Sequence, residues 1–194
     1  YASFRRSELV LAAATIIAVL VLGVLDGVLI AIGLSFLDLL RRVARPHDAI
    51  EGFVPGLAGM HDVDDYPGAQ TIPGLVVYRY DAPLCFANAE DFRRRALAAA
   101  DGSPGPLRWF VLNVEANVEV DFTALEAMET LREEITERGA VFALARVKQD
   151  LLARLEAFGL AGKIGTELLF PTLPVAVQAY QDRTKDPSAG NQGP

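Results

Sequence analysis

The sequence predicts an α/β domain with a mixed, partly parallel β-sheet packed with helices, preceded by a short transmembrane helical hairpin. Three observations lead to this prediction. Residues 9–37 carry a single charge, Asp26. Residues 107–147 have the pattern of a strand, an amphipathic helix and a buried strand, which is the order of a βαβ unit with parallel strands. The formal net charge of -7 divides at Pro46 into +2 before that residue and -9 after it, so two segments suited to different solvents are joined there.

The apolar segment, residues 9–37, is too long for one straight membrane-spanning helix. Such a helix would measure about 44 Å, against about 30 Å of bilayer hydrocarbon. Gly23, Asp26 and Gly27 form a natural break and leave two pieces, residues 9–25 and 27–40, each slightly short for a full crossing. We therefore expect a re-entrant or short-helix hairpin, with a single tilted helix as the alternative. A signal peptide fits poorly, because the stretch is too long and no small-residue cleavage site follows it.

Arginines flank the apolar segment on both sides. Arg5 and Arg6 precede it, and Arg41, Arg42 and Arg45 follow it. Because cationic flanks favour the cytoplasmic side, both ends of the segment are expected on that side, as a hairpin requires.

Two further features of this segment bear on its surroundings. Asp26 is either a functional intramembrane carboxylate or a residue of the hairpin tip, in headgroups or water. A glycine-bearing break in a membrane is tolerable only beside other protein. Because the chain also begins at Tyr1 rather than at methionine, we expect it to be a piece of a longer protein with transmembrane helices upstream.

The first strands of the acidic part follow a junction at Pro46. Residues 47–74 are rich in proline and glycine and contain a short strand candidate at residues 49–54. Residues 74–80 are β-branched and aromatic and predict a strand, with a second short one at residues 84–86.

A helix and a strand are expected next. Asn88 is the predicted N-cap of a helix that carries Glu90 and Asp91 in its first turn and runs to about residue 100. A loop then leads into the predicted strand at residues 107–114.

The remaining elements alternate in the same way. Leucine, methionine and isoleucine recur at helical spacing before a left-handed stop at Gly139, and residues 140–147 form a nearly continuous apolar strand. The helix-forming residues are Leu125, Met128, Leu131 and Ile135. A helix over residues 151–158 ends at Gly159, and a short strand near residues 168–170 precedes a last helix containing Leu173, Val177 and Tyr180.

These elements give three predicted regions. Residues 1–46 are the transmembrane segments and connection, residues 47–183 the α/β domain, and residues 184–194 a polar, disordered tail.

Composition excludes several functions. The acidic domain has the wrong sign for nucleic acid, and one cysteine excludes a disulfide framework. With two histidines and no nucleophile motif, we expect neither an enzyme nor a metal site. Residues 61–65, His-Asp-Val-Asp-Asp, are interpreted as a solvated acidic loop. The stretch 159–163 is too short for a phosphate-binding loop, and Cys85 and Trp109 are interpreted as core residues.

Four local motifs, in this order, resemble the C-terminal end of a SulP-type anion permease, the sulfate transporter family. They are Ala44-Arg45-Pro46-His47, Tyr66-Pro67, Pro73-Gly74 before a strand, and Ala82-Pro83-Leu84-Cys85-Phe86-Ala87-Asn88-Ala89. In that family the membrane part is followed by a cytoplasmic STAS domain, named for sulfate transporters and anti-sigma factor antagonists.

The resemblance implies a multi-pass plasma-membrane protein. It would move sulfate or a related anion by secondary active transport, as a symporter with H⁺ or Na⁺ or as an exchanger, and the anion would bind upstream of this chain. The hairpin would be the last two transmembrane segments, in the gate domain. The STAS domain would regulate, dimerise or recruit partners. An anti-sigma-antagonist-like signalling module anchored in the membrane is the alternative.

The resemblance also marks a candidate site at Asp121-Phe122-Thr123. Thr123 falls on the family's phospho-acceptor position, next to Asp121, whereas Phe122 departs from the usual small hydroxyl residue. Asn88, Asp121, Phe122 and Thr123 together are the candidate loop for a partner or for GDP or GTP. Thr123-x-x-Glu126 also fits a capping box, which accounts for the threonine by structure alone. No other cofactor is expected.

Overall fold

The computed structural model describes residues 2–185, and the side chains of residues 2–8, 11 and 22 lie outside the described part. The chain divides into two compact units, Tyr1–Arg45 and Pro46–Pro194. Each unit is described by itself.

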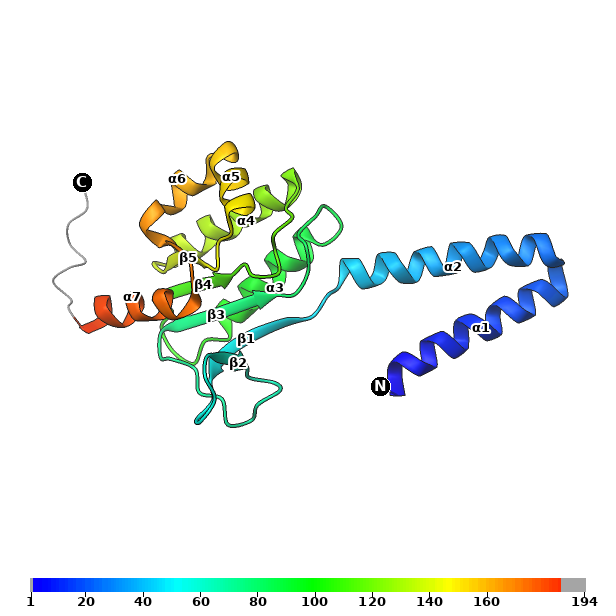
Figure 1. The fold of residues 1–194 in the computed structure, drawn as a ribbon, viewed down its shortest axis with the longest axis horizontal. Coiled ribbons are helices and arrows are strands. Elements are labelled where there is room, and N and C mark those ends of the chain that lie inside the picture. The colour runs from blue at the N-terminus through cyan, green and yellow to red at the C-terminus, as the bar shows by residue number, and fades with distance from the viewer. Residues whose placement is uncertain (1, 186–194) are drawn as a thin grey trace. The chain divides into compact units, whose positions relative to one another are not determined.

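The first unit is a pair of helices, α1 (Ala2–Leu22) and α2 (Val24–Ala44) (Figure 1). The break between them is Gly23, whose φ of 94° lies in the left-handed region that glycine adopts readily. Asp26 is exposed in the first turn of α2, where the helix dipole favours a carboxylate. Arg5 and Arg6 were expected to flank the apolar segment, and their side chains lie outside the described part.

Apolar side chains cover the outside of this helix pair. The most exposed are Leu20, Leu25, Val21 and Val24, each more than 70% accessible. Among the described residues, no helix combines the length and the apolar character needed for a membrane crossing.

The corner of the helix pair depends on a close approach between Gly27 and Val19. A β-carbon placed on Gly27 would lie 2.6 Å from Cα of Val19, which is backbone and cannot rotate away. We expect Gly27→Val to open the corner, whereas Gly33→Val, whose added β-carbon meets nothing within 4 Å, should leave it unchanged. Spin labels at positions 13 and 35, in a Cys85→Ser background, would measure this as a longer inter-label distance for Gly27→Val alone. Equal distances in both variants would contradict the packing of this corner.

The second unit is built on one six-stranded sheet with the order β2-β1-β3-β4-β5-β6. Its strands are β1 (Asp48–Phe53), β2 (Met60–Asp62), β3 (Leu75–Tyr80), β4 (Trp109–Asn113), β5 (Val141–Ala145) and β6 (Leu169–Phe170). Strands β3 to β6 are mutually parallel, and β1 is antiparallel to both β2 and β3. The prediction of a mixed, partly parallel sheet is confirmed.

Helices cover both faces of the sheet (Figure 1). The larger core packs one face against α3 (Ala89–Asp101), α4 (Phe122–Glu137), α5 (Gln149–Phe158) and α6 (Leu160–Ile164). The smaller core packs the other face against α7 (Leu173–Lys185). Phe110, fully buried in β4, lies between the rings of Tyr78 and Phe142 in the larger core, with centroid distances of 5.9 and 6.1 Å.

Four local differences separate the structure from the prediction. The strand expected at residues 84–86 is reduced to a single bridge between Leu84 and Val120. Strand β2 forms where an acidic loop was expected, because its backbone pairs with β1 at the sheet edge. Gly159 ends α5 as predicted and has a left-handed conformation, and the chain then forms the short helix α6, which was not predicted. Helix α7 includes Thr184 and Lys185, the first residues of the predicted tail, and residues 186–194 lie outside the described part.

Candidate functional site

The candidate site is formed where the loop of residues 82–88 meets the N-terminus of α4. Two backbone hydrogen bonds join the segments: Leu84 N–H donates to the carbonyl of Glu119 at 3.0 Å, and Asp121 N–H donates to the carbonyl of Leu84 at 3.2 Å. The sequence-predicted residues Asn88, Asp121, Phe122 and Thr123 are thereby brought into one region, although 33 positions separate Asn88 from Asp121. We call residues 82–88 and 119–123 the α4 loop.

Asp121 holds the α4 loop together through both carboxylate oxygens. Its Oδ1 accepts from Ala124 N–H at 2.9 Å and thus caps α4, while its Oδ2 accepts from Phe86 N–H at 2.7 Å. The predicted capping box was therefore wrong: Thr123 is inside the first turn, and Asp121 is the N-cap. Aspartate is as good an N-cap as serine or threonine, and only Asp121 can also reach the neighbouring loop.

Thr123 and Phe122 both point to solvent. Thr123 is exposed, and Phe122 is 64% accessible, with its ring edge against Phe158 at a centroid distance of 5.4 Å. Phe86, across the loop, is 76% accessible. The α4 loop therefore presents an exposed hydroxyl at a helix N-terminus together with two exposed aromatic rings.

Asn88 is correctly predicted as the N-cap residue of α3, but its side chain makes no capping hydrogen bond to that helix. Its Oδ1 instead accepts from Cys85 N–H at 2.9 Å, and its Nδ2 donates to the carbonyl of Pro83 at 3.0 Å. The Asn88 side chain therefore fixes the shape of the loop. Cys85 within this loop is half-buried, not fully buried as expected.

Asn117 is a member of this region that sequence reasoning missed. It is fully buried, and its Nδ2 donates to the carbonyls of Tyr80 and Ala82 at 2.9 and 2.6 Å, which fixes the start of the 82–88 loop. Its Oδ1 has no hydrogen-bond partner among the described residues. A lone asparagine in a loop carries no sequence signal for this role.

The glycine-rich segment 159–163 has a structural role. Lys163 Nζ donates to Glu129 Oε1 at 2.8 Å, and Arg132 donates to both oxygens of the same carboxylate. The hydrogen bonds from Arg132 and Lys163 lower the pKa of Glu129 to about 2, although burial acts in the opposite direction. Lys163 is therefore engaged in an ion pair between α6 and α4.

The acidic stretch 61–65 is also used by the fold. Asp62 is buried, accepts from Asp64 N–H at 2.9 Å and pairs with the His47 ring at 2.9 Å. Burial raises the pKa of Asp62, but these two hydrogen bonds and the nearby charges of His47 and Arg79 together outweigh it, so the pKa lies below its usual value. In the described part of the chain, no three His, Cys, Asp or Glu side chains are grouped to hold a metal ion.

Mutation distinguishes the two candidate N-cap residues of α4, Asp121 and Thr123. We expect Asp121→Ala to lower the free energy of unfolding by about 1–2 kcal/mol, because the cap and the bond to Phe86 are both lost. Thr123→Ala should change it by no more than about 0.5 kcal/mol, as for an exposed residue without such a role. Denaturation followed by the fluorescence of Trp109, the single tryptophan, measures both. If Thr123→Ala lowered the free energy of unfolding as much as Asp121→Ala, Thr123 would have to cap α4, as the capping box requires.

Comparison with known families decides the fold family. The family model described as "STAS domain" matches residues 66–176, which is more than half of the chain. The chain belongs to the STAS domain family. The match lies within the unit that begins at Pro46, and this unit is called the STAS domain below.

Relatives that are similar over most of this chain carry transporter names. A probable sulfate transporter of Mycobacterium tuberculosis (strain H37Rv) is 66% identical over 182 residues, which cover 94% of this chain and 32% of that protein. Probable sulfate transporter 4.2 of Arabidopsis thaliana is 33% identical over 176 residues, covering 84% of this chain and 26% of that protein. The chain thus spans about a third of the length of these relatives or less. The resemblance drawn from the sequence is confirmed, and the transporter names agree with the expectation that the STAS domain is not an enzyme.

A solved structure supports the same fold. The murine anion transporter Slc26a9, in the inward-facing state, superposes with a TM-score of 0.71 at 21% identity, over 80% of this chain and 25% of that one. At this identity the match bears on the fold alone.

Proposed function

We propose that this chain is the C-terminal part of a secondary-active transporter of sulfate or a related anion in the plasma membrane. The helix pair α1–α2 is the last hairpin of its membrane domain, and the STAS domain, residues 47–183, is a cytoplasmic module that regulates, dimerises or binds partners. The observation that carries this proposal is the 66% identity, over nearly the whole chain, to a protein named as a probable sulfate transporter.

The surface of the helix pair supports a membrane position. Its outward leucine and valine side chains remain exposed within the unit, and apolar surface of this extent needs lipid or further helices to cover it. Arg41 and Arg42 occupy the last turn of α2 and Arg45 follows it, which favours a cytoplasmic end for this helix.

The charge of the STAS domain fits a position beneath the membrane. An excess of nine acidic charges after Pro46 disfavours direct contact with anionic headgroups, and the arginines at the end of α2 are left to make that contact. A partner or a second copy would then approach the domain from the cytoplasm.

A second function is a membrane-anchored signalling module switched at Thr123. The observation in its favour is that Thr123 is exposed in the first turn of a 16-residue helix and is not needed as its cap. A phosphate there would meet the favourable end of the helix dipole, although it would also lie beside the Asp121 carboxylate. Saturable heat of GTP or GDP binding to the chain would support the nucleotide form of this switch, and flat calorimetry would exclude that form.

Radiolabelled sulfate uptake tests the transport proposal. The complete protein that contains this chain would be reconstituted into proteoliposomes, with protein-free liposomes as the control. We expect uptake that saturates with sulfate concentration and depends on an imposed H⁺ or Na⁺ gradient or on a trapped counter-anion. Uptake no greater than that of empty liposomes, for sulfate and for related anions, would overturn the proposal.

A further inference from the structure

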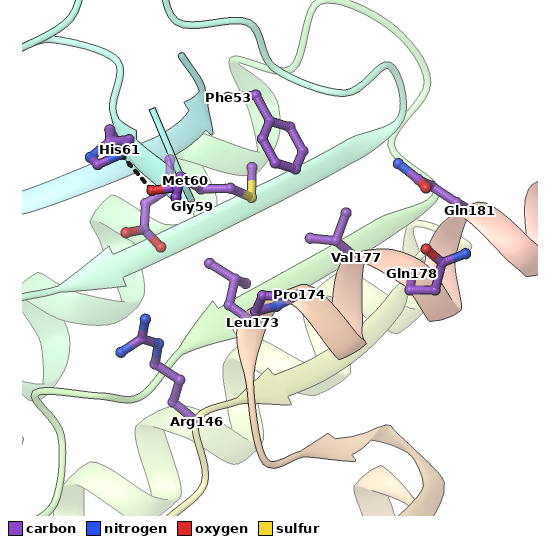
Figure 2. A pocket seen from close by; sticks show the side chains of 12 residues that line it. Phe53, Gly59, Met60, His61, Arg146, Leu173, Pro174, Val177, Gln178 and Gln181 are labelled. Atoms are coloured by element: carbon purple, nitrogen blue, oxygen red, sulfur yellow. Dashed lines mark hydrogen bonds between the residues drawn. The ribbon is translucent and has the colours of Figure 1, made fainter. Parts of the chain in front are cut away.

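The STAS domain has a cavity of about 510 Å³ on the sheet face that carries α7 (Figure 2). Six strands at a spacing of about 4.8 Å make a face roughly 24 Å wide, whereas one helix with its side chains covers only about 10–12 Å. Helix α7 packs on β4, β5 and β6. The part of this face toward β1 is bordered instead by the arm that β1 and β2 form. The cavity lies between this arm and α7, and its volume is within the range of small-molecule sites.

The cavity has an apolar side and a cationic end. Phe53 and Met60 reach it from the β1–β2 arm, and Leu173 and Val177 reach it from α7 (Figure 2). Arg146 comes from the carboxyl end of β5, the edge at which parallel sheets usually bind ligands. The lining also includes the polar residues His61, Gln178 and Gln181, so a ligand that fits it has an apolar body and a polar head.

Arg146 is held at the cavity by an unusual backbone. Its φ of 63° makes it the one non-glycine residue with a left-handed backbone among residues 2–185. Such an outlier is a reason to consider function. Its Nη1 donates to Glu115, but both side chains are nearly half exposed, so this ion pair is weak and can be exchanged. Nε and Nη2 have no partner among the described residues, and they form the planar pair that binds a carboxylate in bidentate fashion.

The buried acid of the cavity argues against a cationic ligand. Glu51 is 3% exposed, and its two oxygens accept from Arg79 Nη1 at 2.8 Å and from Asn113 Nδ2 at 2.7 Å. The charge of Glu51 is thus neutralised within the sheet. Arg146 is therefore the charged side chain of the lining that can form an ion pair with a ligand.

We propose that this cavity binds a small apolar carboxylate, with the carboxylate on Arg146 and the hydrocarbon between the β1–β2 arm and α7. The site lies in the STAS domain, and its lining contains no residue of the α4 loop. It would let the domain respond to the concentration of a small carboxylate. The proposal does not depend on the transport function.

The two methionines of the chain provide a direct test. Met60 lines the cavity, whereas Met128 is fully buried in the core on the opposite face of the sheet. The full chain, labelled with ¹³C at the methionine methyl groups and held in lipid nanodiscs, would be titrated with octanoate and, separately, with the neutral octanamide. We expect octanoate to shift the Met60 signal saturably and to leave the Met128 signal in place, and octanamide to bind at least tenfold more weakly.

Two arginine variants test whether Arg146 binds the carboxylate of the ligand. Arg146→Gln should weaken octanoate binding at least tenfold, and the control Arg138→Gln, at a partly exposed arginine paired with Asp101, should not change it. Absence of a Met60 shift, equal shifts of both methionines, equal binding of octanamide, or unchanged binding by Arg146→Gln would each overturn the proposal.

Discussion

Replacing Phe110 by alanine is expected to lower the free energy of unfolding of the STAS domain by about 3–5 kcal/mol. Phe110 is fully buried in the central strand β4, and its ring packs against Tyr78 on one side and Phe142 on the other. The substitution removes the apolar surface of a whole ring and leaves a cavity between neighbours that β-strand hydrogen bonds hold in place. Because marginal domains have about 5–15 kcal/mol of stability, a loss of this size threatens folding at growth temperature.

Phe86→Ala is the matched control for this substitution. Phe86 is 76% exposed in the α4 loop, so the same change of residue type should alter stability by no more than about 0.5 kcal/mol. Denaturant unfolding followed by Trp109 fluorescence reports on the STAS domain alone, even in the full chain. A loss below about 1 kcal/mol for Phe110→Ala would contradict the position of this ring at the centre of the larger core.

Acidification should destabilise the STAS domain through Glu129. Hydrogen bonds from Arg132 and Lys163 lower the pKa of this carboxyl from 4.5 to about 2 in the folded state. The unfolded chain therefore takes up the proton more readily than the folded one. The stabilisation is fully present above about pH 4.5 and is lost as the pH falls toward 2, and it amounts to about 3 kcal/mol.

The difference between wild type and Glu129→Gln isolates this contribution from that of other carboxyls. We expect Glu129→Gln to be less stable than wild type at pH 7 and the difference to shrink steadily between pH 4.5 and pH 2. Glu133→Gln, at a residue whose side chain is 55% exposed, should follow the wild-type pH profile. A constant difference between wild type and Glu129→Gln across this pH range would show that the ion pair does not hold α6 to α4.

The regular elements of the STAS domain were predictable because their signals are local. The β-branched and aromatic run before Tyr80 and the helical spacing from Leu125 to Ile135 each depend on neighbours in sequence, and both elements are present. Strand β2 was not predicted, because Met60–Asp62 is polar and short, and only pairing with β1 makes it a strand.

The details of the site depended on contacts distant in sequence. Thr123 and Asp121 are both good N-cap residues, and the choice between them is fixed by Phe86, which lies 35 positions earlier and binds the second oxygen of Asp121. The cavity beside Arg146 likewise arises from the packing of α7 against a sheet wider than one helix, which no local pattern records.

Sulfate uptake by the complete protein that contains this chain, with and without its STAS domain, tests the central claim most directly. Both forms, the second ending after Arg45, would be reconstituted at equal protein density and compared in initial rate and oligomeric state. The proposed regulatory and assembly role predicts that removal of the domain changes the uptake rate several-fold or lowers the oligomeric state. Unchanged uptake and unchanged assembly would contradict it.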